Sequence, residues 1–392
     1  MMKWTMSGAA MIAALAISAC SDQGTTQPRS AQPPVSFDRH DDASTDGVGA
    51  VFTSSNAVGG NVVFAFTRRG DGVLSKTGEF PTGGNGVGGD VDPLQSQNSV
   101  VLADDRQHLY VVNAGSNTVS TFSIAPNATL QLLGTTSSGG VRPISLAVSN
   151  HDVFVLNADN SVATLALDDA GVPVGAPVAR VSLGDASDGP STIAATRDGD
   201  FLFVTQRSAN AIDVLRADAR GALSLVERRP SSGGVPFGFA VTKRAQVIVS
   251  EAAGDAPNGA ASSYDLARDG SLTSITSSLS THQAASCWLV LSNNDRFAFV
   301  ANAGSGSISG YAVASNGTLT ALDPSGRTGI TTTPDATPLD MSVTRDGKFL
   351  YALQTGTGTI GSFAIAADGR LTTLADTPGL AAAAGFQGLA AY

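Results

Sequence analysis

The sequence predicts an all-β protein, a seven-bladed β-propeller built from four-stranded antiparallel blades. Three observations support this prediction. A hairpin phrase recurs along the chain, the composition favours short strands, and the last residues supply a strand that the first repeat lacks. Only 14% of the 392 residues are charged and 44 are glycine, a balance that favours strands and tight turns over helices.

The recurring phrase reads as two β-prone runs joined by a small polar turn. It appears as "VVNAGSNTVSTF" at Val111–Phe122 and returns as "VANAGSGSISGY" at Val300–Tyr311. Seven copies occur, about 50 residues apart. The polar residue that closes the first run of each copy lies at Asn56, Asn113, Asn157, Gln206, Glu251, Asn302 and Gln354.

Each repeat contains two further strand signals besides the hairpin. A short apolar run precedes it, such as "SLAVS" from Ser145, and a fourth strand follows a turn such as "RDGSL" from Arg268. A four-stranded meander of this length is the unit of a propeller, because only neighbouring blades can cover its two faces.

The carboxyl terminus predicts how the ring closes. The first repeat begins at Val48 with its second strand, while "GLAAY" at Gly388–Tyr392 is an inner strand without a hairpin after it. We expect this last strand to complete blade 1, so that residues 48–392 form one domain without a bare sheet edge. Two separate β-sandwich domains are the alternative, but they would not predict seven phased copies.

The amino terminus is expected to lie outside the fold. Residues 1–19 read as a lipoprotein signal peptide, with Lys3 before an uncharged run that ends in "ISAC". Cleavage would leave Cys20 as the lipid-carrying first residue, followed by a flexible tether over 20–47 that is rich in Ser, Gln, Pro and Asp. The alternative is ordinary cleavage with an incidental cysteine. With Cys20 acylated, Cys287 is expected to be a small buried residue without a disulfide partner.

These features predict a lipid anchor in a bacterial cell envelope, and Ser21 after the cysteine favours the outer membrane. The formal net charge of −10 and the lack of a basic stripe exclude nucleic acid as the expected partner. The four histidines show no metal-ligand spacing. We therefore expect a monomer with no cofactor and no metal, which takes a small-molecule ligand.

The candidate site is one mouth of the central channel. In a propeller, the loop after the second strand returns to the face where the innermost strand starts, so the seven closing residues should surround that mouth. Residues just before or within the inner strands should join them. The predicted ligand-binding residues are Arg142, Asn113, Asn157, Gln206, His282, Asn302, Asp340 and Gln354. The alternative for the amides is that they hydrogen-bond turn backbones.

Two residues depart from the amide pattern and are the predicted catalytic pair. Glu251 places a carboxylate where other repeats have an amide, and Arg207 follows Gln206 with a guanidinium. Arg207 and Arg142 could hold a carboxylate or phosphate, while Glu251 could act as a general base. A solvated salt bridge on the rim is the alternative.

The segment "TGGNGVGGD", Thr82–Asp90, lies in the longest gap between repeats. It is not a dinucleotide fingerprint, because no strand–helix unit surrounds it. We expect it to project over the same mouth, where it could cap a ligand or merely fill space. Asp90 and Asp92 are calcium candidates, although loop carboxylates are usually just solvated.

With seven such repeats, together with "LYVVNAGSNTVSTF", "DGSL" and "RDGKFLYAL", the chain resembles the lactonase family of seven-bladed propellers over residues 48–392. The resemblance implies a Glu after a second strand, an arginine in a turn of the following blade and a histidine near an earlier inner strand. Glu251 in "VIVSEAAG" matches the first. The following blade has no such arginine, Arg207 lies one blade before Glu251, and "GPSTIAAT" contains no histidine.

Two functions follow as expectations. The first is hydrolysis or isomerisation of a small lactone or sugar acid. The second is a non-catalytic envelope propeller that binds a small ligand, a polysaccharide or a protein.

Overall fold

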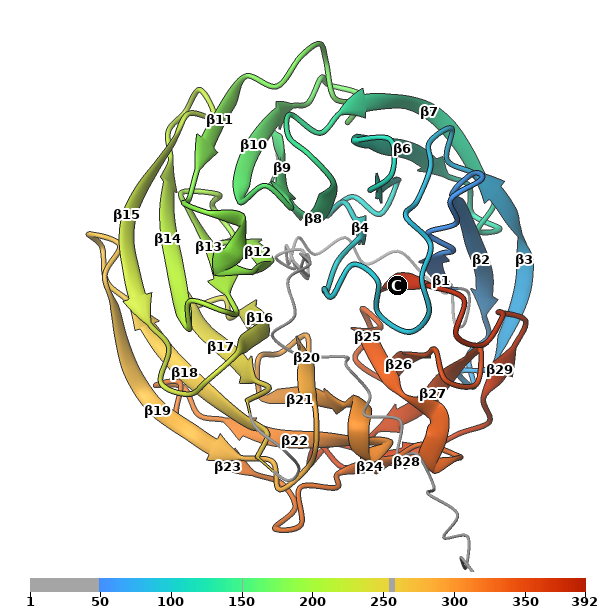
Figure 1. Ribbon diagram of the computed structural model, residues 1–392. Helices are drawn as coiled ribbons and strands as arrows, with labels where there is room; N and C mark the ends of the chain where they lie inside the picture. The colour runs from blue at the N-terminus through green and yellow to red at the C-terminus, as the bar shows by residue number, and fades with distance from the viewer. Residues whose placement is uncertain (1–48, 150, 254–257) are drawn as a thin grey trace, which may run out of the picture.

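The computed structural model describes residues 49–149, 151–253 and 258–392, and these residues form a closed ring of seven β-sheets around a central axis (Figure 1). Each sheet is a meander of four antiparallel strands that runs from the axis outward, and two sheets carry a short extra strand. The predicted all-β, seven-bladed architecture is confirmed. The signal peptide, Cys20 and the tether lie outside the described residues.

The blades are numbered here in ring order, each from its inner to its outer strand. Blade 1 contains β30 (Gln387–Ala391), β1 (Gly49–Ser54), β2 (Val62–Arg68) and β3 (Leu74–Pro81). Blade 2 contains β4 (Val100–Leu102), β5 (His108–Asn113), β6 (Thr118–Ile124) and β7 (Leu130–Ser137). Blade 3 contains β8 (Pro143–Val148), β9 (Asp152–Asn157), β10 (Ser161–Ala166) and β11 (Ala179–Ser182).

The remaining four blades repeat the same order. Blade 4 contains β12 (Pro190–Ala195), β13 (Phe201–Gln206), β14 (Ala211–Ala217) and β15 (Leu223–Pro230), and blade 5 contains β16 (Pro236–Val241), β17 (Gln246–Glu251), β18 (Ala260–Leu266) and β19 (Leu272–Ser280). Blade 6 contains β20 (Ser286–Leu291), β21 (Phe297–Asn302), β22 (Ser307–Val313), β23 (Leu319–Ala321) and the extra β24 (Gly329–Ile330). Blade 7 contains β25 (Pro338–Val343), β26 (Phe349–Gln354), β27 (Thr359–Ile365), β28 (Leu371–Thr373) and the extra β29 (Thr377–Pro378). Three single-turn 3₁₀ helices lie at η1 (Ala186–Asp188), η2 (Ala303–Ser305) and η3 (Pro334–Ala336).

The carboxyl-terminal strand closes the ring as predicted. β30 pairs antiparallel with β1, with Phe52 opposite Ala390 and Thr53 opposite Leu389. The backbone of Ala50 also exchanges hydrogen bonds with Tyr392 in both directions, at 3.2 and 3.0 Å. Residues near the two ends of the propeller therefore share one sheet, as expected for a ring closed by the carboxyl-terminal strand.

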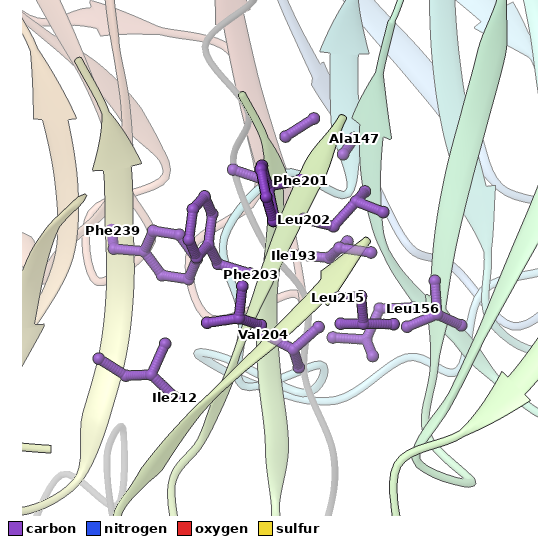
Figure 2. Close-up of a cluster of buried hydrophobic side chains, with 14 of the residues drawn as sticks. Ala147, Leu156, Ile193, Phe201, Leu202, Phe203, Val204, Ile212, Leu215 and Phe239 are labelled. Atoms are coloured by element: carbon purple, nitrogen blue, oxygen red, sulfur yellow. The ribbon is translucent and has the colours of Figure 1, made fainter. Parts of the chain in front are cut away.

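The core lies between the blades, because each sheet is apolar on both faces. Blade 4 shows this in Figure 2, where Phe203 meets Phe239 of blade 5 edge to face with ring centroids 6.2 Å apart. On the other side, Leu215 points toward Leu156 of blade 3. Because successive side chains of each strand point to opposite faces of the sheet, each blade packs against both of its neighbours, and removal of one blade would expose the faces that it covers.

Cys287 lies on the inner strand β20 and is fully buried, as predicted. It is engaged in a disulfide bond, so the expectation that it lacks a partner is wrong. The one other cysteine of the sequence, Cys20, lies outside the described residues. Within the described residues, no helix is both long and apolar enough to cross a membrane.

Candidate functional site

Six of the seven predicted mouth residues end their second strands, while Asn56 lies two residues after β1. The side chains of all seven are buried inside the blades. Each has at most 2% of its surface exposed. Loops that lead to the inner strands pack directly against these side chains. A Cβ on Gly84 would lie 2.5 Å from Cγ of Asn113, and one on Gly140 would lie 2.5 Å from Cγ of Asn157, too close for any atom. A glycine is therefore required above these amides.

The amides hold their own hairpins together. Asn113 donates from Nδ2 to Thr118 at 3.1 Å and to Ser120 at 2.7 Å. Asn302 makes the equivalent pair of bonds five and seven residues on, to Ser307 at 3.2 Å and Ser309 at 3.0 Å. The two nearly identical phrases of the sequence thus encode one hydrogen-bond motif.

The other three predicted amides also bond inside the protein. Asn157 donates to the carbonyl of Ser138 at 3.2 Å, Gln206 donates to Asp213 at 2.8 Å, and Gln354 donates to Asp376 at 3.3 Å. Of these three, only Asn157 bonds a backbone group, as the alternative expected, whereas Gln206 and Gln354 bond carboxylate side chains. The ligand-binding role of the five amides remains a prediction.

Glu251 lies at the equivalent position, the end of β17, but it accepts hydrogen bonds where Asn113 and Asn302 donate them. Its Oε1 accepts from the backbone N–H of Gly233 at 2.8 Å and from the hydroxyl of Ser262 at 2.5 Å. In blade 2 the equivalent hydroxyl of Ser120 donates outward to a carbonyl, whereas Ser262 accepts from the N–H of Ser278 at 2.8 Å and so turns its proton inward. The side chain at residue 251 therefore acts as a hydrogen-bond acceptor, where Asn113 and Asn302 act as donors.

Arg207 and Arg142, by contrast, lie at the axis. The loop of residues 91–99, called the axial loop below, crosses the channel mouth where the inner strands begin, which we call the upper mouth. Arg142 donates from Nη2 to the carbonyl of Pro93 at 2.7 Å. Arg207 is 2% exposed and lies near enough to Asp92 to stabilise its carboxylate. Two of the predicted arginines therefore converge on one short segment.

The axial loop is attached to blades across the ring. The side-chain amide of Gln97 donates to the carbonyl of Leu289 at 2.6 Å and accepts from its N–H at 2.8 Å, so it satisfies the free inner edge of β20. The indole of Trp288 donates to the carbonyl of Ser96. Ser96 in turn donates from its hydroxyl to Gln387 on β30 at 3.3 Å. Residues 91–99 make these contacts across the ring. The preceding segment Thr82–Asp90, which was expected to project over the mouth, lies against Asn56 and Asn113.

Asp340 connects the axial loop to the ring closure. One of its oxygens accepts from the N–H of Asn98 and the other from the N–H of Gly388, both at 3.1 Å. Burial raises the pKa of Asp340 to about 7, against these hydrogen bonds. This carboxyl group joins blades 1, 2 and 7.

Asp92 lies beside Asp340 in the same buried cluster. Its Oδ1 accepts from the N–H of Ser96 at 3.2 Å. Burial, and then repulsion from Asp340, raise the pKa of Asp92 well above its usual range, while the Ser96 N–H, Gln387 and Arg207 oppose that rise. A carboxyl group with a raised pKa beside arginines is an arrangement suited to proton transfer.

Sequence reasoning considered Asp92 only as a calcium candidate. Its one signal was the long gap between repeats in which it lies. Among the described residues, no cluster of three or more His, Cys, Asp or Glu is arranged to hold a metal.

His282 and Glu251 do not join the axial cluster. His282 is exposed on the loop between β19 and β20, where its ring contacts Ser280 at 3.4 Å. Glu251 makes its hydrogen bonds with Gly233 and Ser262, within or beside blade 5. The catalytic role of this pair remains a prediction.

The order of strands and the seven repeats agree with a known family. A family model described as a lactonase, seven-bladed β-propeller, matches residues 86–178, 176–253 and 249–335, which together span more than half of the chain. The chain belongs to the lactonase family. The comparison with curated proteins found no match.

Solved structures resemble this lactonase-family chain over most of their length. A periplasmic gluconolactonase of Pseudomonas aeruginosa is 17% identical, with a TM-score of 0.65 over 88% of this chain and 98% of that one. A protein of Bacteroides uniformis, provisionally assigned as a 6-phosphogluconolactonase, is 17% identical with a TM-score of 0.66 over 88% and 99%. A Lactobacillus plantarum protein is 15% identical with a TM-score of 0.69, again over 88% and 99%. Likeness at this level of identity shows the shared fold.

Proposed function

We propose that this lactonase-family propeller hydrolyses a small lactone, or isomerises a related sugar acid, at the upper mouth of its channel. The observation that carries the proposal is the convergence of Arg142 and Arg207 on the axial loop beside Asp92. Similarity to a structure described as a gluconolactonase supports the same class of substrate.

The residues suggest a division of roles in hydrolysis. Asp92 accepts a proton from water, whose oxygen adds to the lactone carbonyl carbon. The ring C–O bond then breaks, and the leaving alkoxide takes up the proton to give a hydroxy acid. Arg142 and Arg207 stabilise the developing oxyanion or the product carboxylate. Glu251 is the alternative base that the family pattern suggests.

Turnover of a lactone panel, followed by pH-stat titration, tests this proposal. We expect the purified protein to hydrolyse at least one member, such as δ-gluconolactone. Asp92→Asn should lower kcat/KM by about 10²- to 10⁴-fold, the range typical for loss of a general base, while Glu251→Gln should leave it within a few-fold. A large loss in Glu251→Gln alone would move the base to Glu251.

Binding without catalysis is the second candidate, and the axial loop favours it. Gln97 and Asn98 tie this loop to blades 6 and 7, so the upper mouth is already occupied by protein groups. If no lactone is turned over, but gluconate binds to the wild type and not to Arg142→Gln, the chain is a binding protein and the hydrolase proposal is wrong.

We also propose that Cys20 carries lipid and anchors the protein in the bacterial cell envelope. The "ISAC" sequence supports this, as does similarity to a protein described as periplasmic. We expect a radioactive fatty acid to label the wild type but not Cys20→Ser; equal labelling of the two proteins would contradict the proposal.

A further inference from the structure

The axial loop covers Asp92, the base of the proposed reaction. Asp92 is 8% exposed, and its Oδ1 accepts a hydrogen bond from the N–H of Ser96 in the same loop. The loop leads into β4 near the centre of the ring (Figure 1). A lactone in solution cannot contact this carboxyl group while Ser96 and its neighbours stay in place, so turnover at the upper mouth requires part of the loop to move.

Residues 95–98 are the part of the loop that can move. Before them, Leu94 is 1% exposed in the apolar cluster of blades 2 and 3. After them, β4 begins at Val100 and pairs with β5. The four residues between these fixed points are all polar, so they are attached to the ring through hydrogen bonds rather than through apolar packing.

Gln97 provides the central attachment of this segment. It is 1% exposed, and its side-chain amide exchanges two hydrogen bonds with the backbone of Leu289, at 2.6 and 2.8 Å. Gly238 of β16 makes room for it, because a Cβ there would overlap Oε1 of Gln97. A single side chain thus pairs with the free edge of β20, where water could take its place if the segment moved away.

Other features of the segment oppose this closed position. Gln95 and Asn98 have left-handed backbones, with φ of 53° and 73°, a conformation that costs energy in residues other than glycine. Three buried polar atoms, Oε1 of Gln95, Nδ2 of Asn98 and Oγ of Ser99, find no hydrogen-bond partner among the residues that the structure describes. Because buried polar groups without partners cost energy that hydration would recover, these atoms favour opening.

We propose that residues 95–98 form a gate over Asp92, which Gln97 holds closed and which opens to admit the ligand of the upper mouth. Opening breaks the bonds of Gln97 to Leu289 and of the Ser96 N–H to Asp92, and so uncovers the carboxyl group. The inference rests on the proposed function, because it concerns access to the same site. Opening itself is a property of the loop and can be measured without a ligand.

Amide hydrogen exchange, measured by mass spectrometry on the peptide that spans residues 91–99, tests whether the gate opens. Gln97→Met keeps a side chain of similar length but removes both hydrogen bonds to Leu289. We expect the amides of Ser96 and Asn98 to exchange about 10-fold faster than in the wild type, as for the loss of one or two hydrogen bonds. Peptides from the blade cores should exchange at the wild-type rate, which separates gate opening from a loss of folding.

Gln246→Met is the matched control. Gln246 is 5% exposed, donates from Nε2 to the carbonyl of Ser315 at 3.1 Å and accepts at Oε1 from Thr242 at 3.2 Å. The variant therefore also loses one donated and one accepted hydrogen bond, but at the first residue of β17. Exchange in residues 91–99 should stay at the wild-type rate.

Ligand measurements test whether the gate controls the site. Because a ligand binds only the open fraction, Gln97→Met should raise kcat/KM for δ-gluconolactone, or tighten gluconate binding, by about 3- to 10-fold. A misfolded protein cannot show such a gain.

The gate is rejected if residues 91–99 exchange no faster in Gln97→Met than in Gln246→Met. It is also rejected if faster exchange brings no gain in a protein that binds gluconate or hydrolyses a lactone. If neither ligand interacts with the wild type or with Gln97→Met, the proposed function is wrong instead, and the exchange rates alone decide whether the gate opens.

Discussion

A single buried polar residue at the end of each second strand organises its blade. Asn113 and Asn302 donate to hydroxyl groups on the third strand, while Glu251 accepts from the hydroxyl of Ser262. A buried donor or acceptor must find a partner of the opposite kind. The N–H of Ser278, which donates to Ser262, therefore favours an acceptor at residue 251.

At this scale we predict that Ser262→Ala destabilises the protein more than Glu251→Gln. The alanine removes the hydroxyl that donates to the buried carboxylate of Glu251, which costs about 1–3 kcal/mol. Glutamine keeps a carbonyl oxygen for Gly233 and Ser262, so its cost should be about 1 kcal/mol or less. Urea unfolding of both variants measures the difference, and a larger loss in Glu251→Gln would contradict the reversed hydrogen-bond direction.

The sequence shows that Glu251 departs from the amide pattern, but it does not show why. Residue 251 is a glutamate where other repeats have an amide. The direction of the Ser262 hydrogen bond, however, depends on the backbone N–H of Ser278 in another strand. Asp92 was undervalued for a related reason, because its neighbours Asp340 and Arg207 lie more than 100 residues away in the sequence.

Among the elements, the loops between blades matter most for the upper mouth. The loops before β4 and β8 pass directly over Asn113 and Asn157, and the close approach at Gly84 and Gly140 leaves no room for a side chain. The segment Thr82–Asp90 was expected to cap a ligand or merely fill space. In the structure, this segment continues into the axial loop, which makes hydrogen bonds with three other blades.

Gly84→Ala should therefore cost about 1–3 kcal/mol of stability, the range typical for overpacking. Its Cβ would lie 2.5 Å from Cγ of Asn113. Gly134→Ala is the matched control, since nothing lies within 4 Å of its Cβ and the residue has no left-handed backbone. Thermal unfolding should show a clear drop for the first variant alone; similar melting of both proteins would mean that the loop yields easily.

In the whole molecule, Asp340 links ring closure to the axial loop. Its folded pKa of about 7 is above the ordinary value of an aspartate. The folded state thus binds the proton more tightly, so this group contributes stability at low pH that is lost as the pH rises from about 4 through about 7. Asp92 acts in the same direction.

We expect the melting temperature of the wild type to be lower at pH 8.5 than at pH 5.5, by an amount equivalent to a few kcal/mol. Asp340→Asn should be less stable at low pH, because an amide cannot accept from both Asn98 and Gly388, but its pH dependence should be flatter. Calorimetry at the two pH values measures both effects. An unchanged slope in Asp340→Asn would show that other groups carry the dependence.

The architecture could be predicted because the same pattern of strands and turns recurs seven times in the sequence. Repetition of the hairpin phrase fixed the blade count, and the unmatched strand at Gly388–Tyr392 fixed the closure. The candidate site at the upper mouth was harder to predict because its residues do not recur from one repeat to the next. Arg142 and Arg207 could be placed at the mouth from the topology, but the axial loop has no repeat equivalent to indicate its path.

The most direct test of the central claim is a crystal structure of the protein with bound gluconate, the hydroxy acid formed from δ-gluconolactone. We predict that the carboxylate of gluconate lies within hydrogen-bond distance of Arg142 or Arg207, beside Asp92 at the upper mouth. Gluconate bound against Glu251 inside blade 5, or at any place away from the axis, would contradict it.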